Sequence, residues 1–149
     1  MMRVVIEMIT ATIACFGFSI IYQARPNRLV LCGLSGGITW GVCRLAEQFN
    51  SNLFIYYMIA AAFGTLLSEF LARRTKCPAT IFLIPALLPM VPGGSLYYTT
   101  YAIVTGDHKG AIYYGQRTAL AALGIAVGLV IVSVFMYYFN ELKSHMKKA

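Results

Sequence analysis

Apolar residues along this chain come in five long runs separated by short polar segments. The runs cover residues 4–22, 29–46, 53–72, 78–104 and 115–139. A helix needs roughly 20 mostly apolar residues to cross the hydrocarbon core of a bilayer. The pattern therefore predicts an all-α, polytopic membrane protein in which residues 1–149 form a single transmembrane domain of five helices.

The positions of the basic residues predict how these helices are oriented. With five crossings, one side of the membrane receives eight basic residues and the other side receives four. The eight are Arg25, Arg28, Arg73, Arg74, Lys76, Lys143, Lys147 and Lys148, and the four are Arg3, Arg44, Lys109 and Arg117. Since loops rich in Lys and Arg stay in the cytoplasm, we expect the N-terminus outside and the C-terminus in the cytoplasm.

Composition supports a membrane protein and argues against several other classes. Of the 149 residues, 59% are hydrophobic and 11% are charged, whereas soluble domains have about 45–50% apolar and about 25% charged residues. The net charge of +7 lies between and after the apolar runs, which indicates a lipid bilayer as partner and no nucleic acid. The sequence holds no HExxH, GxSxG or P-loop motif and its four cysteines form no CxxC, so we expect no enzyme, cofactor or metal site.

The fourth run contains three closely spaced prolines. Pro85, Pro89 and Pro92 fall within eight residues and are followed by Gly93 and Gly94. Each proline inside a helix removes one hydrogen bond and clashes with the preceding turn, at a cost of about 3 kcal/mol. The sequence therefore predicts that the fourth helix is broken.

Such a break is a candidate substrate site. Non-helical backbone is tolerated at membrane depth where protein or a water-filled cavity satisfies it, and transporters bind solutes at such breaks. A helix restarting after the break would direct N–H groups towards a carboxylate. The predicted substrate pathway comprises Pro85, Pro89, Pro92, Gly93, Gly94, Ser95, Tyr97, Tyr98, Arg44 and Gly37. The alternatives are a proline kink that only shapes packing, or a loop that splits the run.

Small residues recur at four-residue spacing on several runs. This spacing lets two membrane helices approach closely. The predicted helix-packing glycines are Gly33, Gly37, Gly41, Gly64, Gly124 and Gly128. Glycines that line a solute path are the alternative interpretation.

Charged residues within or near the bilayer are costly and therefore informative. Glu7 lies about one turn inside the first run, where it either pairs with Arg3 at i,i+4 or couples transport to protons. Glu69 precedes Arg73 by four residues, the spacing of a helical ion pair, and proton coupling is again the alternative. Arg44 either extends to the membrane interface or holds a carboxylate solute.

The order of these features resembles a known family. The chain reads Gly17-Phe-Ser-Ile-Ile-Tyr22, then Arg25-Pro26, then a glycine-rich helix ending in Arg44, then Pro85-Ala-Leu-Leu-Pro89-Met-Val-Pro92-Gly93. This order resembles the small subunit of the two-component threonine/serine exporter (ThrE-type) family over almost the whole chain. The family pattern has a larger apolar residue in place of Gly94.

The resemblance implies a specific function. Such small subunits are five-helix proteins of the inner (cytoplasmic) membrane that act with a larger membrane subunit. They export small amino acids or dicarboxylates, driven by the proton motive force. We therefore expect a subunit of a proton-coupled exporter of threonine and serine or of succinate, that is, of a small carboxylate-bearing solute. The alternative is a non-transporting assembly or regulatory subunit, and association of the chain into an oligomer is left open.

Overall fold

The computed structural model describes residues 2–146, and every regular element among them is a helix. The elements are α1 (Met2–Ile21), α2 (Pro26–Phe49), α3 (Leu53–Thr75), α4 (Thr80–Leu87), the 3₁₀ helix η1 (Leu88–Met90), α5 (Gly93–Val104) and α6 (His108–Met146). Lys147 and Lys148, which contribute to the predicted charge bias, lie outside the described residues. The all-α fold is confirmed.

The helices match the lengths that a polytopic membrane protein needs. Within the described residues, α1, α2, α3 and α6 are each long and apolar enough to cross a membrane. The segments Thr80–Met90 and Gly93–Val104 together form one further candidate span, bent by 52°. Length and composition thus support a polytopic membrane protein with four spans, or with five if the bent pair crosses the membrane as the predicted broken fourth span.

Helices α6 and α2 begin at least three residues earlier than the apolar runs predict. The sixth helix starts at His108, seven residues before the run over 115–139, because the Asp107 side chain accepts a hydrogen bond from the Gly110 N–H (3.0 Å) and so caps the first turn. Helix α2 starts at Pro26, a residue suited to the first helical position. Helix ends depend on such capping contacts and not only on apolarity.

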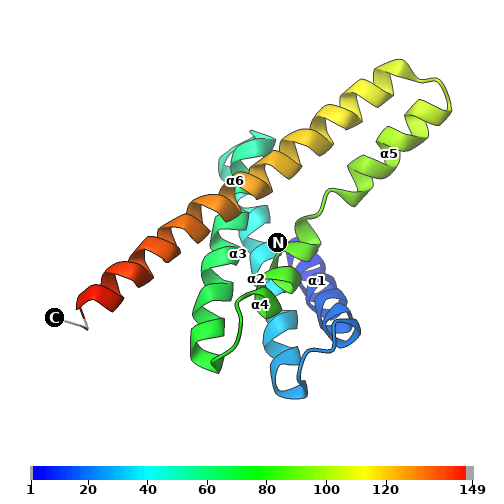
Figure 1. The fold of residues 1–149 in the computed structure, drawn as a ribbon. Helices are drawn as coiled ribbons and strands as arrows, with labels where there is room; N and C mark the ends of the chain where they lie inside the picture. The colour runs from blue at the N-terminus through cyan, green and yellow to red at the C-terminus, as the bar shows by residue number, and fades with distance from the viewer. Residues whose placement is uncertain (1, 147–149) are drawn as a thin grey trace.

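Helix α2 is the centre of a four-helix bundle. It packs against α1, α3 and α4, and α4 also packs against α3 (Figure 1). Its buried face consists mainly of small residues, including Gly33, Gly36, Gly37 and Gly41. Small side chains on this face let three neighbours contact one helix at the same time.

The predicted packing glycines lie at helix contacts in this bundle. A Cβ at Gly33 would lie 3.1 Å from the Thr12 carbonyl oxygen, and one at Gly37 would lie 3.0 Å from the Met8 carbonyl oxygen, both on α1. A Cβ at Gly41 would lie 2.7 Å from the Met8 methyl group. These three glycines therefore face α1 and leave no room for a solute where they contact it.

The other predicted glycines bring α3 against its neighbours. A Cβ at Gly64 would lie 2.9 Å from the Thr39 methyl group of α2. On α6, a Cβ at Gly124 would lie 2.6 Å from the Phe54 carbonyl oxygen of α3, and one at Gly128 would overlap the Met58 carbonyl oxygen. Helix α6 thus crosses α3 in direct backbone contact (Figure 1).

Helix α5 and the first half of α6 form a hairpin that extends away from the bundle (Figure 1). The turn between them contains Gly106 at φ 75°, a conformation that glycine adopts without strain. Tyr98 of α5 stacks on Tyr114 of α6, with ring centroids 5.2 Å apart. Within the described residues, α5 packs chiefly against α6 and not against the bundle.

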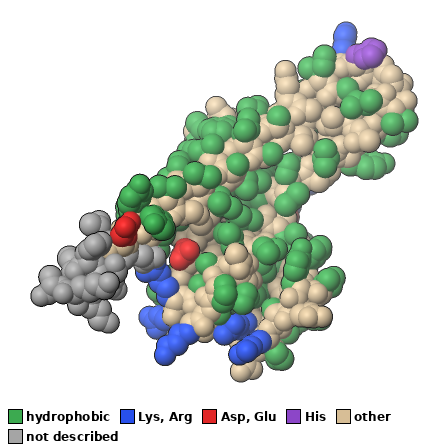
Figure 2. Space-filling view, in the orientation of Figure 1, with side chains coloured by type: hydrophobic (Ala, Val, Ile, Leu, Met, Phe, Trp, Pro, Cys, Tyr) green, Lys and Arg blue, Asp and Glu red, His purple; other side chains and the backbone are tan. Residues whose placement is uncertain are grey.

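Apolar side chains cover much of the outer surface, as Figure 2 shows. A lipid environment accepts such a surface, whereas large exposed apolar patches are rare on soluble monomers. Basic side chains gather at the end of the bundle that holds the α1–α2 and α3–α4 turns (Figures 1 and 2). This clustering agrees with the placement of basic residues in the predicted first and third loops.

Candidate functional site

A carboxylate of α1 is bound by an arginine of α2. Arg44 Nε donates to Glu7 Oε2 at 2.6 Å, and Arg44 Nη2 donates to Glu7 Oε1 at 2.8 Å. Arg44 Nη1 also donates to Glu47 Oε2 at 2.5 Å. The Trp40 indole N–H lies 3.4 Å from Glu7 Oε2. We call these four residues the Glu7 network.

The geometry of the α1–α2 hairpin explains why these residues meet. Glu7 lies 14 residues before the end of α1, and Trp40 lies 14 residues after the start of α2. Since the two helices are antiparallel and rise equally per residue, these side chains reach the same level. Arg44 follows Trp40 by four residues and therefore lies one turn further along the same face.

The Glu7 network corrects one interpretation drawn from the sequence and adds contacts to another. Glu7 forms its ion pair with Arg44 and not with Arg3, because the guanidinium fork of the neighbouring helix matches both carboxylate oxygens. Arg44 in turn is held by two carboxylates in this structure, and its predicted contact with a carboxylate solute stays a prediction.

The charges of the Glu7 network do not cancel. Two carboxylates, Glu7 and Glu47, share the single positive charge of Arg44, which leaves one net negative charge. The side chains of Glu7 and Arg44 are only 26% and 29% exposed. Arg3, one turn before Glu7, is the other cation that acts on it.

The Glu7 network borders the proline break. Glu7, Trp40 and Pro89 line one cavity of about 450 Å³ between α1, α2 and η1, together with Phe18 and Leu88. Most of the lining is apolar, and Glu7 is its charged member. The structure therefore brings the carboxylate of the first span beside the backbone irregularity of the fourth.

Two cysteines satisfy the backbone carbonyls that the prolines deprive of donors. In a regular helix, residue i donates its N–H to the carbonyl of residue i−4. Pro85 therefore leaves the Ile81 carbonyl without its donor, and the Cys32 thiol lies 3.5 Å from that oxygen. Pro89 likewise frees the Pro85 carbonyl, and Cys15 Sγ lies 3.2 Å from it.

The carbonyl that the third proline frees is bonded by a backbone N–H of the same segment. Pro92 frees the Leu88 carbonyl, which accepts the Val91 N–H at 3.2 Å. The freed carbonyls of the broken span are thus all partnered, two of them by neighbouring helices. The sequence analysis assigned the cysteines no role of this kind, because the role depends on which helices are neighbours.

The structure divides the predicted substrate pathway into two groups. Pro85 and Pro89 lie in the bundle, beside α1 and α2. Gly93, Gly94, Ser95, Tyr97 and Tyr98 lie at the start of the α5–α6 hairpin, where Tyr97 and Tyr98 are exposed. Gly37 lies apart from both groups, on the face of α2 that α1 covers.

The remaining predicted charged site lies on α3. Glu69 Oε2 is 3.8 Å from Arg73 Nη2, so the predicted i,i+4 ion pair is present. It is near the C-terminal end of α3, away from the Glu7 network, which joins the start of α1 to the end of α2. Glu69 therefore serves as an internal comparison for Glu7.

Comparison with known proteins adds the family. The family described as "Threonine/Serine exporter, ThrE" matches residues 7–135. An uncharacterized protein of Haemophilus influenzae (strain ATCC 51907 / DSM 11121 / KW20 / Rd) is 23% identical over 110 residues, which are 74% of this chain and 37% of the relative. The matched part of the chain thus covers little more than a third of that relative's length. No solved structure matches the chain. With five candidate spans and a family match over most of its length, the chain belongs to the threonine/serine exporter ThrE family of membrane transporters.

Proposed function

We propose that this chain is a membrane subunit of a proton-coupled exporter of small amino acids or dicarboxylates, such as threonine, serine or succinate. It acts with a larger membrane subunit in the inner membrane, with its N-terminus outside and its C-terminus in the cytoplasm, and it catalyses no chemical reaction. The observation that carries the proposal is the Glu7 network, which lies beside the proline break in a member of an exporter family.

The Glu7 network can link a proton to a carboxylate solute. Arg44 binds Glu7 through two parallel N–H···O bonds, and a solute carboxylate would need the same guanidinium fork. A proton on Glu7 would weaken its ion pair with Arg44, and a solute carboxylate would compete with Glu7 for the same guanidinium fork. Both events act on one ion pair and are therefore linked, as coupling requires.

Two observations support a larger partner. The Haemophilus relative is about twice as long as this chain, so additional protein accompanies the family region there. In this chain, the α5–α6 hairpin stands apart from the bundle and exposes apolar side chains such as Leu96, Tyr97 and Tyr101. A second membrane subunit would cover this hairpin.

Efflux of labelled solutes tests the proposal. Cells loaded with labelled threonine, serine or succinate would carry the chain alone, the chain with its larger subunit, or both subunits with an uncoupler. We expect efflux only with both subunits and its loss on uncoupling.

A matched pair of variants tests the role of Glu7. Glu7→Gln should reduce uncoupler-sensitive efflux at least tenfold, because glutamine carries no proton for coupling. Glu69→Gln removes a carboxylate from another ion pair and should change efflux less than twofold. Wild-type efflux with unchanged uncoupler sensitivity in Glu7→Gln would refute the coupling mechanism.

The unattached hairpin also favours a second candidate function, a non-transporting assembly or regulatory subunit. In that case Glu7→Gln should leave the activity of the complex unchanged. Gly128→Leu, which would disrupt the contact of α6 with α3, should prevent the complex from forming. Detection of the complex by co-purification together with efflux separates the two candidates.

A further inference from the structure

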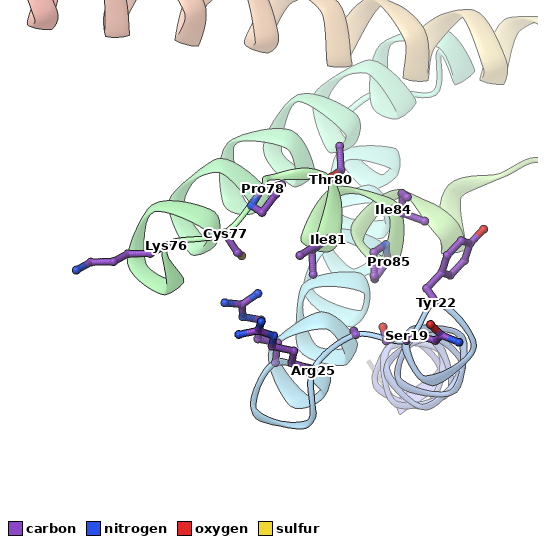
Figure 3. Close-up of a pocket in the computed structure, with 13 residues that line it drawn as sticks. Ser19, Tyr22, Arg25, Lys76, Cys77, Pro78, Thr80, Ile81, Ile84 and Pro85 are labelled. Atoms are coloured by element: carbon purple, nitrogen blue, oxygen red, sulfur yellow. The ribbon is translucent and has the colours of Figure 1, made fainter.

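A second cavity lies at the basic end of the bundle, away from the Glu7 network. Its volume is about 510 Å³, within the range of small-molecule sites. The α1–α2 turn, the end of α3 and the first half of α4 form its walls (Figure 3). We call this cavity the basic pocket.

The lining of the basic pocket is positively charged on one side and apolar on the other. Arg25, Arg28 and Lys76 contribute three positive charges, and none of the described lining residues is acidic. Ile81 and Ile84 of α4 provide apolar surface opposite. Figure 3 shows Arg25 on the α1–α2 turn, across the cavity from Cys77 and Ile81, whereas Lys76 lies at the rim and points away.

The arginines retain hydrogen-bonding capacity. Arg28 Nη2 donates to the Thr75 carbonyl oxygen at 3.2 Å, which ties the start of α2 to the end of α3. This bond uses one of the five N–H donors of a guanidinium group. Two guanidinium groups that share a cavity repel each other, and an anion between them would remove the repulsion while forming charge-assisted hydrogen bonds.

We propose that the basic pocket binds a single oxyanion group, the carboxylate of a small solute or the phosphate of a lipid headgroup. Both have the planar or tetrahedral oxygens that arginine forks recognise, and the apolar wall of α4 accommodates a short carbon chain or the start of an acyl chain. Binding here does not depend on the proposed transport function, and it is tested without measuring transport.

The basic pocket also contacts the broken span directly. Pro85, whose carbonyl accepts the Cys15 thiol, lines the pocket from α4. An anion bound here therefore lies against the segment that precedes the break. Under the proposed orientation this end faces the cytoplasm, where an exporter takes up its solute, so a bound solute carboxylate would mark the entry of the pathway.

Binding to the purified full chain tests the proposal. The chain would be placed in nanodiscs of uncharged phosphatidylcholine and titrated with succinate or with short-chain phosphatidylglycerol by calorimetry. We expect saturable, salt-sensitive binding of at least one probe. Succinate alone identifies a solute site, phosphatidylglycerol alone identifies a headgroup site, and mutual competition identifies a shared oxyanion site.

A charge-matched pair of variants assigns the binding to the pocket. Arg25→Gln with Arg28→Gln should weaken binding at least tenfold. Arg73→Gln with Arg74→Gln removes the same charge from the same end of the molecule but outside the pocket, and should weaken binding less than twofold. Equal weakening by both pairs, or no binding of either probe to the wild-type chain, would overturn the proposal.

One further variant tests whether misfolding explains a loss of binding. Arg28 makes an interhelical hydrogen bond, so its loss could disturb the fold. Arg25 is exposed and makes no side-chain capping bond to α2, so Arg25→Gln alone should leave the melting temperature unchanged and still weaken binding several-fold. An unchanged affinity in this variant would count against the pocket.

Discussion

At the scale of single residues, the prolines free backbone carbonyls, and side chains of neighbouring helices bond to two of those carbonyls. Each proline removes one backbone donor, and an unpaired carbonyl in a membrane is costly. Cys15 and Cys32 supply replacement donors from α1 and α2. A thiol is a weak donor but also a small apolar group, so it suits a buried helix contact better than a larger polar side chain.

Replacing Cys15 tests this role. Cys15→Ala leaves the Pro85 carbonyl without a partner, whereas Cys43 is similarly buried and has no contact with a proline-freed carbonyl among the described hydrogen bonds. We expect Cys15→Ala to lower the free energy of unfolding by about 1 kcal/mol more than Cys43→Ala does. Denaturant unfolding in detergent micelles measures both, and equal losses would show that the thiol contact contributes nothing.

At the scale of elements, the fourth span consists of two short helices joined at Pro92. The bend of 52° directs α5 away from the bundle and into the hairpin with α6. A Cβ at Gly93 or Gly94 would meet no atom within 4 Å. These glycines are therefore not required for packing in this conformation, which leaves the freedom of the backbone as their contribution.

Substitution at Gly93, in the hinge between α4 and α5, distinguishes a need for backbone freedom during transport from a need for glycine in folding. Gly93→Leu should be expressed and folded like the wild type, because the site is open, but should lose export at least tenfold if the hinge changes conformation during transport. Gly17→Leu is the control, since its site is equally open and it lies on α1, outside the segment with the proline break. Normal export by Gly93→Leu would show that the hinge is static.

At the scale of the whole molecule, the proposed topology depends on whether the bent pair crosses the membrane. The α1–α2 turn lies at the basic end of the bundle, and the tip of the α5–α6 hairpin lies far from it (Figure 1). If the pair is one span, an odd number of crossings separates the two turns. If the pair is a re-entrant loop, both turns lie on the same side.

Labelling with a membrane-impermeant maleimide distinguishes these arrangements. Asn27→Cys places a thiol at the basic end, and Lys109→Cys places one at the hairpin tip; both positions are exposed. In intact cells we expect labelling at position 109 and none at position 27 until the membrane is permeabilised. The unsubstituted chain is the blank for its native cysteines. Labelling of both positions from outside would contradict the five-span topology.

The sequence by itself determined the features that depend on local chemistry. The lengths of the apolar runs predicted the helices, and the three prolines predicted the break, because helix propensity and the missing N–H act within a few residues. The i,i+4 spacing of Glu69 and Arg73 predicted their ion pair for the same reason. The order of these motifs was also sufficient to indicate the family.

Only the tertiary structure decided which distant residues meet. Glu7 and Arg44 are 37 positions apart, and the thiol of Cys15 reaches a carbonyl 70 positions away. The basic pocket joins the first turn to the end of α3 in the same way. Such contacts depend on which helix faces pack together and where each span bends, and these follow from the summed packing of the bundle, which no single segment of the sequence encodes.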